Sequence, residues 1–177
     1  MTPFFTIGHS TRPVEDFIAL LAESSVAIVV DVRTVPRSRT NPQYNRDALP
    51  ATLAAAGVGY THLASLGGLR PRSRVVAPEV NGYWENASFH NYADYALSAP
   101  FAEGIAALRA IGHARRATVM CSEAVWWRCH RRIVADWLIA AGESVVHIMA
   151  PGNAEPATLT PAAVRDTDGR VTYPALL

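Results

Sequence analysis

The amino-acid sequence predicts a three-layer α/β fold with a mainly parallel sheet of about five strands, and three observations lead to this prediction. Short apolar runs alternate along the chain with longer segments of helical periodicity. Several of these runs end in glycine or polar residues, which is where a parallel sheet places its site. The chain has 177 residues, enough for one core that buries roughly 70% of the unfolded surface. We therefore expect a single Rossmann-like domain over residues 1–177.

The expected strands are short and apolar. The run Val26–Val30 is continuously apolar, as expected for a strand covered on both faces. Four further strands are expected at residues 4–7, 59–63, 117–120 and 145–149. Right-handed crossovers would place the carboxyl ends of all parallel strands at one edge of the sheet. The residues expected to face a shared crevice at that edge are His9, Ser10, Asp31, Arg33, Gly67, Gly68 and Cys121 to Glu123.

Helical periodicity fills the intervals between these strands. Apolar residues between positions 14 and 21 recur at the i, i+3, i+4, i+7 spacing of one buried helical stripe. Gly57 and Gly142 are suited to end two of the other helices, because glycine readily adopts the left-handed conformation found there. Pro100 is expected to break one helical segment into two. These other helices are expected at residues 47–56, 91–97, 101–112 and 127–141.

Three segments show little periodicity. Residues 34–46 are rich in proline, asparagine and arginine and are expected to form an ordered loop. Residues 69–91 are long for a loop inside a compact domain, so we interpret them as a lid over a site. The lid's aromatic residues, which could stack on a nucleobase or pin the lid to the body, are Tyr83, Trp84 and Phe89. Residues 150–177 form an irregular C-terminal extension, with a short helix after Thr160 and a small hairpin ending at Tyr173.

The composition excludes several classes of protein. All sixteen basic residues are arginine, so a lysine Schiff base and a P-loop lysine are absent. No run approaches the ~20 apolar residues of a membrane span, and the N-terminus lacks the features of a signal peptide. We expect a cytoplasmic protein without a membrane partner. In a reducing compartment its two cysteines would be thiols or ligands rather than a disulfide.

The arginines cluster near the expected ends of strands. One group follows the second strand, a second follows the third strand, and a third lies beside the cysteines. Guanidinium groups bind phosphate and carboxylate in a bidentate manner, so the clusters indicate an anionic partner, either a small molecule or a nucleic acid. The three groups are Arg33, Arg37, Arg39 and Arg46; Arg70, Arg72 and Arg74; and Arg128, Arg131 and Arg132.

The stretch 118–132 contains both cysteines together with acidic, basic and imidazole side chains. Cys121 is expected between a strand and a helix N-terminus, where the helix dipole and nearby arginines favour the thiolate. It is either a nucleophile, a ligand or a buried core thiol. Cys129 and His130 are expected in the first turn of the following helix, with His130 facing inward either as a proton carrier or as a core residue.

The spacing within this stretch argues against several known sites. A phosphatase loop needs arginine six positions after its cysteine, and Trp127 occupies that position. No G-x-G-x-x-G sequence follows the first strand, and the two cysteines are not a Cys-x-x-Cys redox pair, although they could approach each other. Cys121, Glu123, Cys129 and His130 could assemble a metal shell, but their spacing matches no common zinc module. The cofactor stays open, with a metal held through Cys121, Cys129 and His130 as one alternative.

Several short motifs together resemble the domain-of-unknown-function family numbered 488. They are Thr6 to Ser10; Asp31 to Arg33 with Pro36, Ser38 and Arg39; Leu66 to Gly68; Tyr92-Ala93; Cys121 to Glu123; and Cys129 to Arg131. The family often has a proline where this chain has Val125 to Trp127. The resemblance implies a bacterial cytosolic α/β protein and supports a site at these residues, but it assigns no reaction.

We therefore expect an enzyme, a thiol-dependent hydrolase or transferase, that acts on an anionic substrate resembling a nucleotide or nucleic acid. The expected catalytic residues are Cys121, Glu123, Cys129, His130, His9 and Asp31. The expected substrate-binding residues are Ser10, Arg33, Ser38, Arg39, Gly67, Gly68 and Arg131. A non-catalytic module that binds nucleic acid or another ligand, and a metal-binding Cys/His site, are the alternatives.

Overall fold

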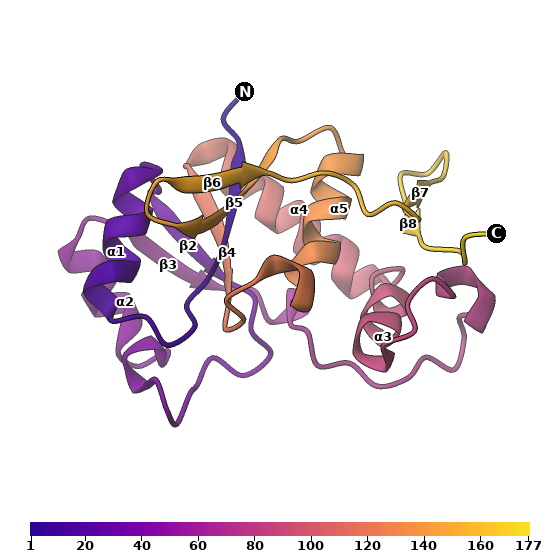
Figure 1. The fold of residues 1–177 in the computed structure, drawn as a ribbon, viewed down its shortest axis with the longest axis horizontal. Helices are drawn as coiled ribbons and strands as arrows, with labels where there is room; N and C mark the ends of the chain where they lie inside the picture. Colours follow the sequence, from indigo (N-terminus) through magenta and orange to yellow (C-terminus); the bar gives the residue numbers. More distant parts are fainter.

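The computed structural model describes residues 1–177 and contains the expected α/β architecture around a six-stranded sheet (Figure 1). The strand order is β3-β2-β4-β1-β5-β6, and the first five of these strands in that order run parallel. Their bounds are β1 (Phe4–Gly8), β2 (Ile28–Asp31), β3 (Gly59–His62), β4 (Ala117–Cys121) and β5 (Val145–Ala150). The prediction of a mainly parallel sheet is confirmed.

The sixth strand was not expected from the sequence. β6 (Asn153–Pro156) pairs antiparallel with β5 at one edge of the sheet. Its residues are mostly exposed and show no alternation of apolar and polar side chains, so its sequence lacks a strand signal. The segment after Ala150, interpreted as irregular, therefore begins as part of the sheet.

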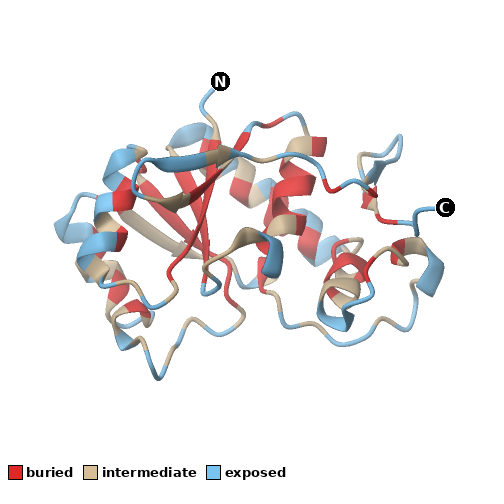
Figure 2. Cartoon of the chain, viewed as in Figure 1, coloured by how far each residue is buried: buried red, intermediate tan, exposed pale blue.

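Helices cover both faces of the sheet and form the outer two layers (Figures 1 and 2). The helices are α1 (Val14–Glu23), α2 (Leu49–Ala55), α3 (Ala87–Tyr95), α4 (Ala99–Ala114) and α5 (Arg131–Ala140). Val29 packs with α1 and α2 in one core, whereas its neighbour Val30 packs with α3, α4 and α5 in the other. Adjacent strand residues alternate between two cores because the sheet is covered on both sides.

Three expected helix boundaries were wrong. α3 begins at Ala87 because the Asn86 side chain accepts hydrogen bonds from the amides of Ser88 and Phe89, which shortens the segment interpreted as a lid. The expected division into two helices is present, but it lies at residues 96–98, and Pro100 is in the first turn of α4, which begins at Ala99, since proline is tolerated there. α5 begins only at Arg131, after a separate short turn at Trp126–Arg128.

The C-terminal extension is docked on the body of the protein. The small hairpin is present as β7 (Val164–Arg165) and β8 (Val171–Thr172), but no helix follows Thr160. Buried Asp136 on α5 accepts hydrogen bonds from the Thr160 amide at 2.9 Å and the Tyr173 hydroxyl at 2.9 Å. One carboxylate thus fastens both ends of the hairpin to α5.

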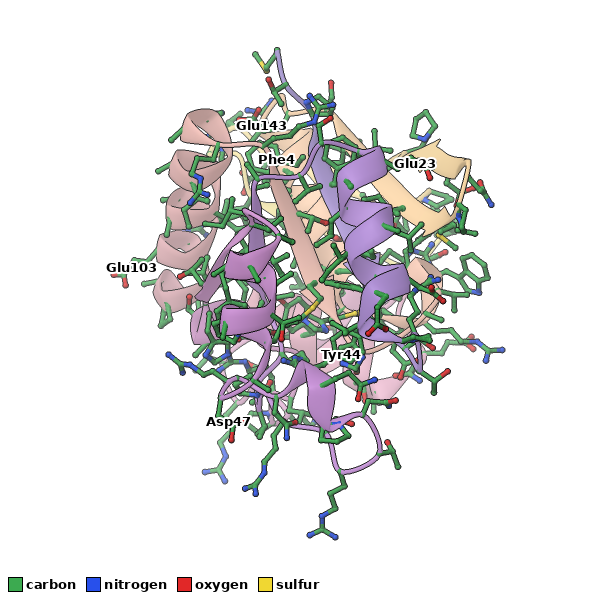
Figure 3. All side chains as sticks on the ribbon, turned by 90° about the vertical axis from the view of Figure 1, so that its left-hand side faces the viewer. Phe4, Glu23, Tyr44, Asp47, Glu103 and Glu143 are labelled. Atoms are coloured by element: carbon green, nitrogen blue, oxygen red, sulfur yellow. The ribbon has the colours of Figure 1, made fainter.

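The parallel strands end together at one edge of the sheet. Gly8 lies opposite Cys121, and Asp31 lies opposite both Met120 and His62. In Figure 3, Phe4 and Glu143 mark the opposite edge, while Tyr44 and Asp47 lie where the loops after the strands gather. The polar residues that follow these strands therefore meet, as the crossover rule requires.

Candidate functional site

A cavity of about 560 Å³ opens at the carboxyl edge of the sheet. Eight residues predicted from the sequence line it: His9, Arg33, Ser38, Gly68, Cys121, Glu123, Cys129 and His130. Eight others that were not among the expected catalytic or substrate-binding residues line it as well: Thr34, Val35, Arg37, Leu69, Ser88, Phe89, Ser122, which was expected to face the crevice, and Arg128. Five predicted residues do not line it: Ser10, Asp31, Arg39, Gly67 and Arg131.

The segment 122–130 forms one wall of the cavity and is fixed against β1. The amides of His9 and Ser10 donate to the carbonyls of Cys121 and Ser122 at 2.9 and 3.0 Å. Gly8 allows this approach, because a Cβ atom there would overlap the carbonyl oxygen of Glu123. The wall therefore depends on a glycine at the end of a buried strand.

Arg131 acts inside the protein and not in the cavity. Its side chain is fully buried, and Nη1 donates to the Cys121 Sγ at 2.7 Å and to the Glu123 carbonyl at 2.6 Å. Nη2 donates to the Ala124 carbonyl at 3.2 Å. A guanidinium fork can satisfy several acceptors at once, so Arg131 holds the wall in place and supplies positive charge behind the sulfur atoms.

Cys129 and His130 form a thiol–imidazole pair at the start of α5. The His130 Nε2 lies 2.9 Å from the Val32 carbonyl, which can only accept, so Nε2 carries the proton. Burial lowers the pKa of His130, which leaves the ring neutral with a free lone pair on Nδ1. That Nδ1 lies 3.6 Å from the Cys129 Sγ, so it can accept the thiol proton.

The two cysteines have opposite pKa shifts. Burial raises the pKa of Cys121 well above its usual value, and the neighbouring Cys129 adds to this shift. Burial also opposes ionisation of Cys129, but the Cys121 thiol, the Arg131 charge and the Arg131 amide outweigh it, so the pKa of Cys129 is lowered. The pair therefore favours a thiolate on Cys129 beside a protonated Cys121. The sequence had favoured Cys121 as the nucleophile.

Both cysteines are free thiols. No group of three His, Cys, Asp or Glu side chains is arranged to hold a metal ion. Cys121, Glu123, Cys129 and His130 come from one segment, but Glu123 is exposed whereas both cysteines are buried. The predicted metal shell does not assemble from these residues.

Asp31 positions Arg33 and does not face the cavity. Its carboxylate binds the Arg33 guanidinium through two hydrogen bonds of 2.9 and 2.7 Å, and it also accepts from the Tyr60 hydroxyl. Arg33 donates further to the Tyr44 carbonyl at 2.7 Å. A buried charge pair of this geometry fixes the arginine in place, so Arg33 presents a rigid positive charge at the cavity wall.

His9 is a neutral partner of Arg33. Its Nδ1 lies 2.8 Å from the Ser10 carbonyl and must donate there, which leaves Nε2 to accept from the Arg33 Nη1 at 3.4 Å. Burial lowers the pKa of His9 to about 4, and its ring stacks on Tyr44 at 4.2 Å. His9 therefore steadies the arginine and can offer no proton of its own at neutral pH.

The two glycines after β3 support side chains of the site. A Cβ atom on Gly68 would lie 2.5 Å from the His130 Nδ1, and one on Gly67 would lie 2.6 Å from the Thr34 hydroxyl oxygen. The backbone at these glycines packs closely against Thr34 and His130, and Gly68 also lines the cavity. Gly68 thus leaves room for the His130 ring.

Aromatic residues of the predicted lid fasten it to the body. Trp84 is buried, stacks on Phe89 at 4.9 Å and contacts Tyr173 edge-on at 5.2 Å. Phe89 also lines the cavity from the first turn of α3. The other residues were located by the rule that site residues follow the ends of parallel strands. This rule could not locate Ser88 and Phe89, because they lie on α3, which follows no strand end. Arg37 and Arg128, by contrast, belong to the arginine clusters of the sequence.

These features define a three-layer α/β protein with a buried cysteine pair in an arginine-lined cavity at the carboxyl edge of a parallel sheet. The family model described as "Domain of unknown function DUF488" matches residues 13–138, and the chain belongs to this family. No curated protein and no solved structure matches the chain. None of its helices combines the length and apolar character needed to cross a membrane.

Proposed function

We propose that the protein is a thiol-dependent hydrolase or transferase that acts on an anionic, phosphate-bearing substrate in the cavity at the carboxyl edge. The observation that carries this proposal is the Cys129–His130 pair, whose imidazole is oriented by the Val32 carbonyl. A nucleophile, a base and a group that orients the base are the components of covalent catalysis by a thiol. Both side chains line the cavity.

In the proposed reaction, the neutral His130 Nδ1 accepts the Cys129 thiol proton and the thiolate attacks the electrophilic centre of the substrate. The bond to the leaving group breaks, and that group departs with the bonding electrons and the proton from His130. Water, or another acceptor in a transferase, then loses a proton to His130 and displaces the sulfur. The displaced Cys129 thiolate recovers that proton from His130, which returns the pair to its starting state.

The preference for an anion comes from the arginines. Arg33 is fixed at the cavity wall by Asp31, while Arg37 and Arg128 line the cavity with exposed side chains. Guanidinium groups bind phosphate oxygens through paired hydrogen bonds and stabilise charge that develops there. The substrate's phosphate would rest on these arginines with its reacting centre over Cys129.

The test combines turnover with trapping of the covalent intermediate. Nucleoside phosphates and simple phosphate esters are incubated with the protein, product release is followed by chromatography, and acid-quenched protein is weighed by mass spectrometry. We expect turnover and an adduct on Cys129, both lost in Cys129→Ser. The matched Cys121→Ser variant should retain the adduct, because Cys121 is the protonated partner.

A non-catalytic anion-binding module is the alternative, and the exposed arginines at the cavity favour it. It predicts that Cys129→Ser binds the same anions as the wild type and that no adduct forms with any of them. That result would overturn the enzymatic proposal. A cytoplasmic location is part of the proposal, since a reducing compartment keeps both thiols free.

A further inference from the structure

A series of hollows that share lining residues leads away from the cysteine cavity, and we call this series the groove. The cysteine cavity shares Gly68, Leu69 and Ser88 with a neighbouring hollow that continues to Pro71. Pro71 in turn lines a depression with residues 72–74, which also line a second cavity of about 570 Å³. The groove therefore follows the loop 68–78 from the sulfur atoms along the N-terminal end of α3.

Positive charge is concentrated around this groove. The segments after β2, β3 and β4, residues 32–48, 63–77 and 122–130, contain eight of the sixteen arginines but only Asp47 and Glu123 of the fifteen acidic residues. The rest of the chain is consequently net negative. A formal net charge of +1 thus conceals a strongly positive edge.

Several of these arginines are free to bind a ligand. Arg72 and Arg74 are exposed and make no hydrogen bond or ion pair through their side chains, and the same is true of Arg37, Arg39 and Arg128. Elsewhere, Arg109 binds Glu143, Arg115 the Ala27 carbonyl and Arg116 the Ser24 carbonyl, whereas Arg165 and Arg170 of the C-terminal hairpin are exposed and lie outside the groove. Exposed guanidinium groups along a groove suit a ligand with repeated negative charges.

The second cavity also contains two acidic residues, of which Asp94 is buried and already has partners inside the protein. Asp94 accepts from the Asn81 amide at 2.7 Å and lies 3.6 Å from His90. Glu85 is exposed at the rim. Arg72 and Arg74 therefore share their part of the groove with one exposed carboxylate, Glu85.

We propose that the substrate is a single-stranded nucleic acid, with one nucleotide in the cysteine cavity and the adjoining phosphates along Arg72 and Arg74. This inference rests on the proposed function and names its substrate class. The cavity has the volume of a site for one small ligand, and its apolar walls include the Phe89 ring, a surface on which a base can stack. Cys121 and Cys129 are only 2% and 3% exposed, so a nucleotide held in a duplex cannot reach them.

Binding of a fluorescein-labelled single-stranded 12-mer, measured by fluorescence anisotropy at several salt concentrations, tests the inference. The measurement uses Cys129→Ser protein so that no turnover occurs. The groove variant carries Arg72→Ser and Arg74→Ser; the control carries Arg165→Ser and Arg170→Ser, two exposed arginines that line neither cavity. Loss of two phosphate contacts should weaken binding about tenfold and reduce the slope of log K against log salt by about 1.4 in the groove variant only.

Three outcomes would overturn the inference: equal effects of the groove and control variants, a mononucleotide that binds as tightly as the 12-mer, or preferential binding of duplex DNA or polyglutamate. The proposed function is tested separately. An adduct on Cys129 that forms with a mononucleotide and is unaffected by Arg72→Ser and Arg74→Ser would support the enzymatic proposal and contradict a polymeric substrate. Binding of the 12-mer that depends on Arg72 and Arg74 but gives no adduct would contradict the enzymatic proposal and indicate a non-catalytic binding module.

Discussion

Gly8 determines the position of the cavity wall although it does not line the cavity. It ends β1 directly opposite Cys121, and its missing side chain leaves space for the Glu123 carbonyl. The Arg131 guanidinium then holds that carbonyl and the Cys121 sulfur together. The position of the cavity wall is thus set by one absent side chain and one buried charge.

Gly8→Ala should displace the segment 122–130, because the added methyl group would overlap backbone that cannot easily yield. We expect a lower melting temperature, by several degrees, and at least tenfold slower alkylation of Cys129, measured by calorimetry and by mass spectrometry. Gly82→Ala is the control, since a Cβ there would meet its nearest atom at 3.6 Å. Equal behaviour of the two variants would contradict this account of the wall.

At the scale of elements, α5 joins the site to the C-terminal hairpin. Its first residue, Arg131, holds the cavity wall, and its buried Asp136 binds the two ends of the hairpin. Arg132 lies between them in sequence, donates to the Thr160 hydroxyl at 3.1 Å and sits over the Trp84 ring. One helix therefore organises the site at its N-terminus and the docking of the extension along its side.

Asp136→Ala would leave the Thr160 amide and the Tyr173 hydroxyl without their partner. We expect the free energy of unfolding to fall by about 3 kcal/mol, because buried polar groups that lose a charged acceptor are costly. Chemical denaturation measures the loss, with Asp168→Ala, an exposed carboxylate of the hairpin turn, as the control. Alkylation of Cys129 should be unchanged in both variants, and a loss of reactivity in Asp136→Ala would show that the hairpin and the site are coupled.

The sequence predicted the elements whose apolar residues recur at regular spacing. It predicted less well the features that depend on contacts of individual side chains. Five parallel strands follow from apolar runs, and the rule for crossovers brings His9, Arg33 and Cys121 to one edge. β6 lacks such a run, and α5 starts later than its apolar pattern because Cys129 has an extended backbone. Periodicity does not report a residue's backbone angles, so it could not separate the turn at 126–128 from the helix.

Residue roles were the least predictable part of the site. Asp31 lies at the expected strand end and Arg131 lies beside the cysteines, but the side chains of both are bound to partners inside the protein. Whether Arg33 or Arg131 faces the cavity depends on tertiary packing between residues that are far apart in the sequence. His130 and Val32, for example, form a hydrogen bond although they are 98 positions apart. Such contacts leave no local pattern in a single sequence.

At the scale of the whole molecule, two asymmetries coincide. Eight of the sixteen arginines lie in the loops at the carboxyl edge of the sheet, and the same edge holds a pair of buried thiols with pKa values shifted in opposite directions. An anion drawn to this edge would meet Cys129, whose ionisation the Arg131 charge favours. The account therefore depends on Cys129 being the reactive thiol of the folded protein.

The most direct test is the rate of iodoacetamide alkylation at each cysteine as a function of pH, measured by peptide mass spectrometry on the native protein. We predict that Cys129 reacts first, with an apparent pKa below the 9.0 of an ordinary thiol, and that Cys121 resists modification. Faster reaction of Cys121, or a Cys129 that stays unmodified until the protein unfolds, would contradict the account.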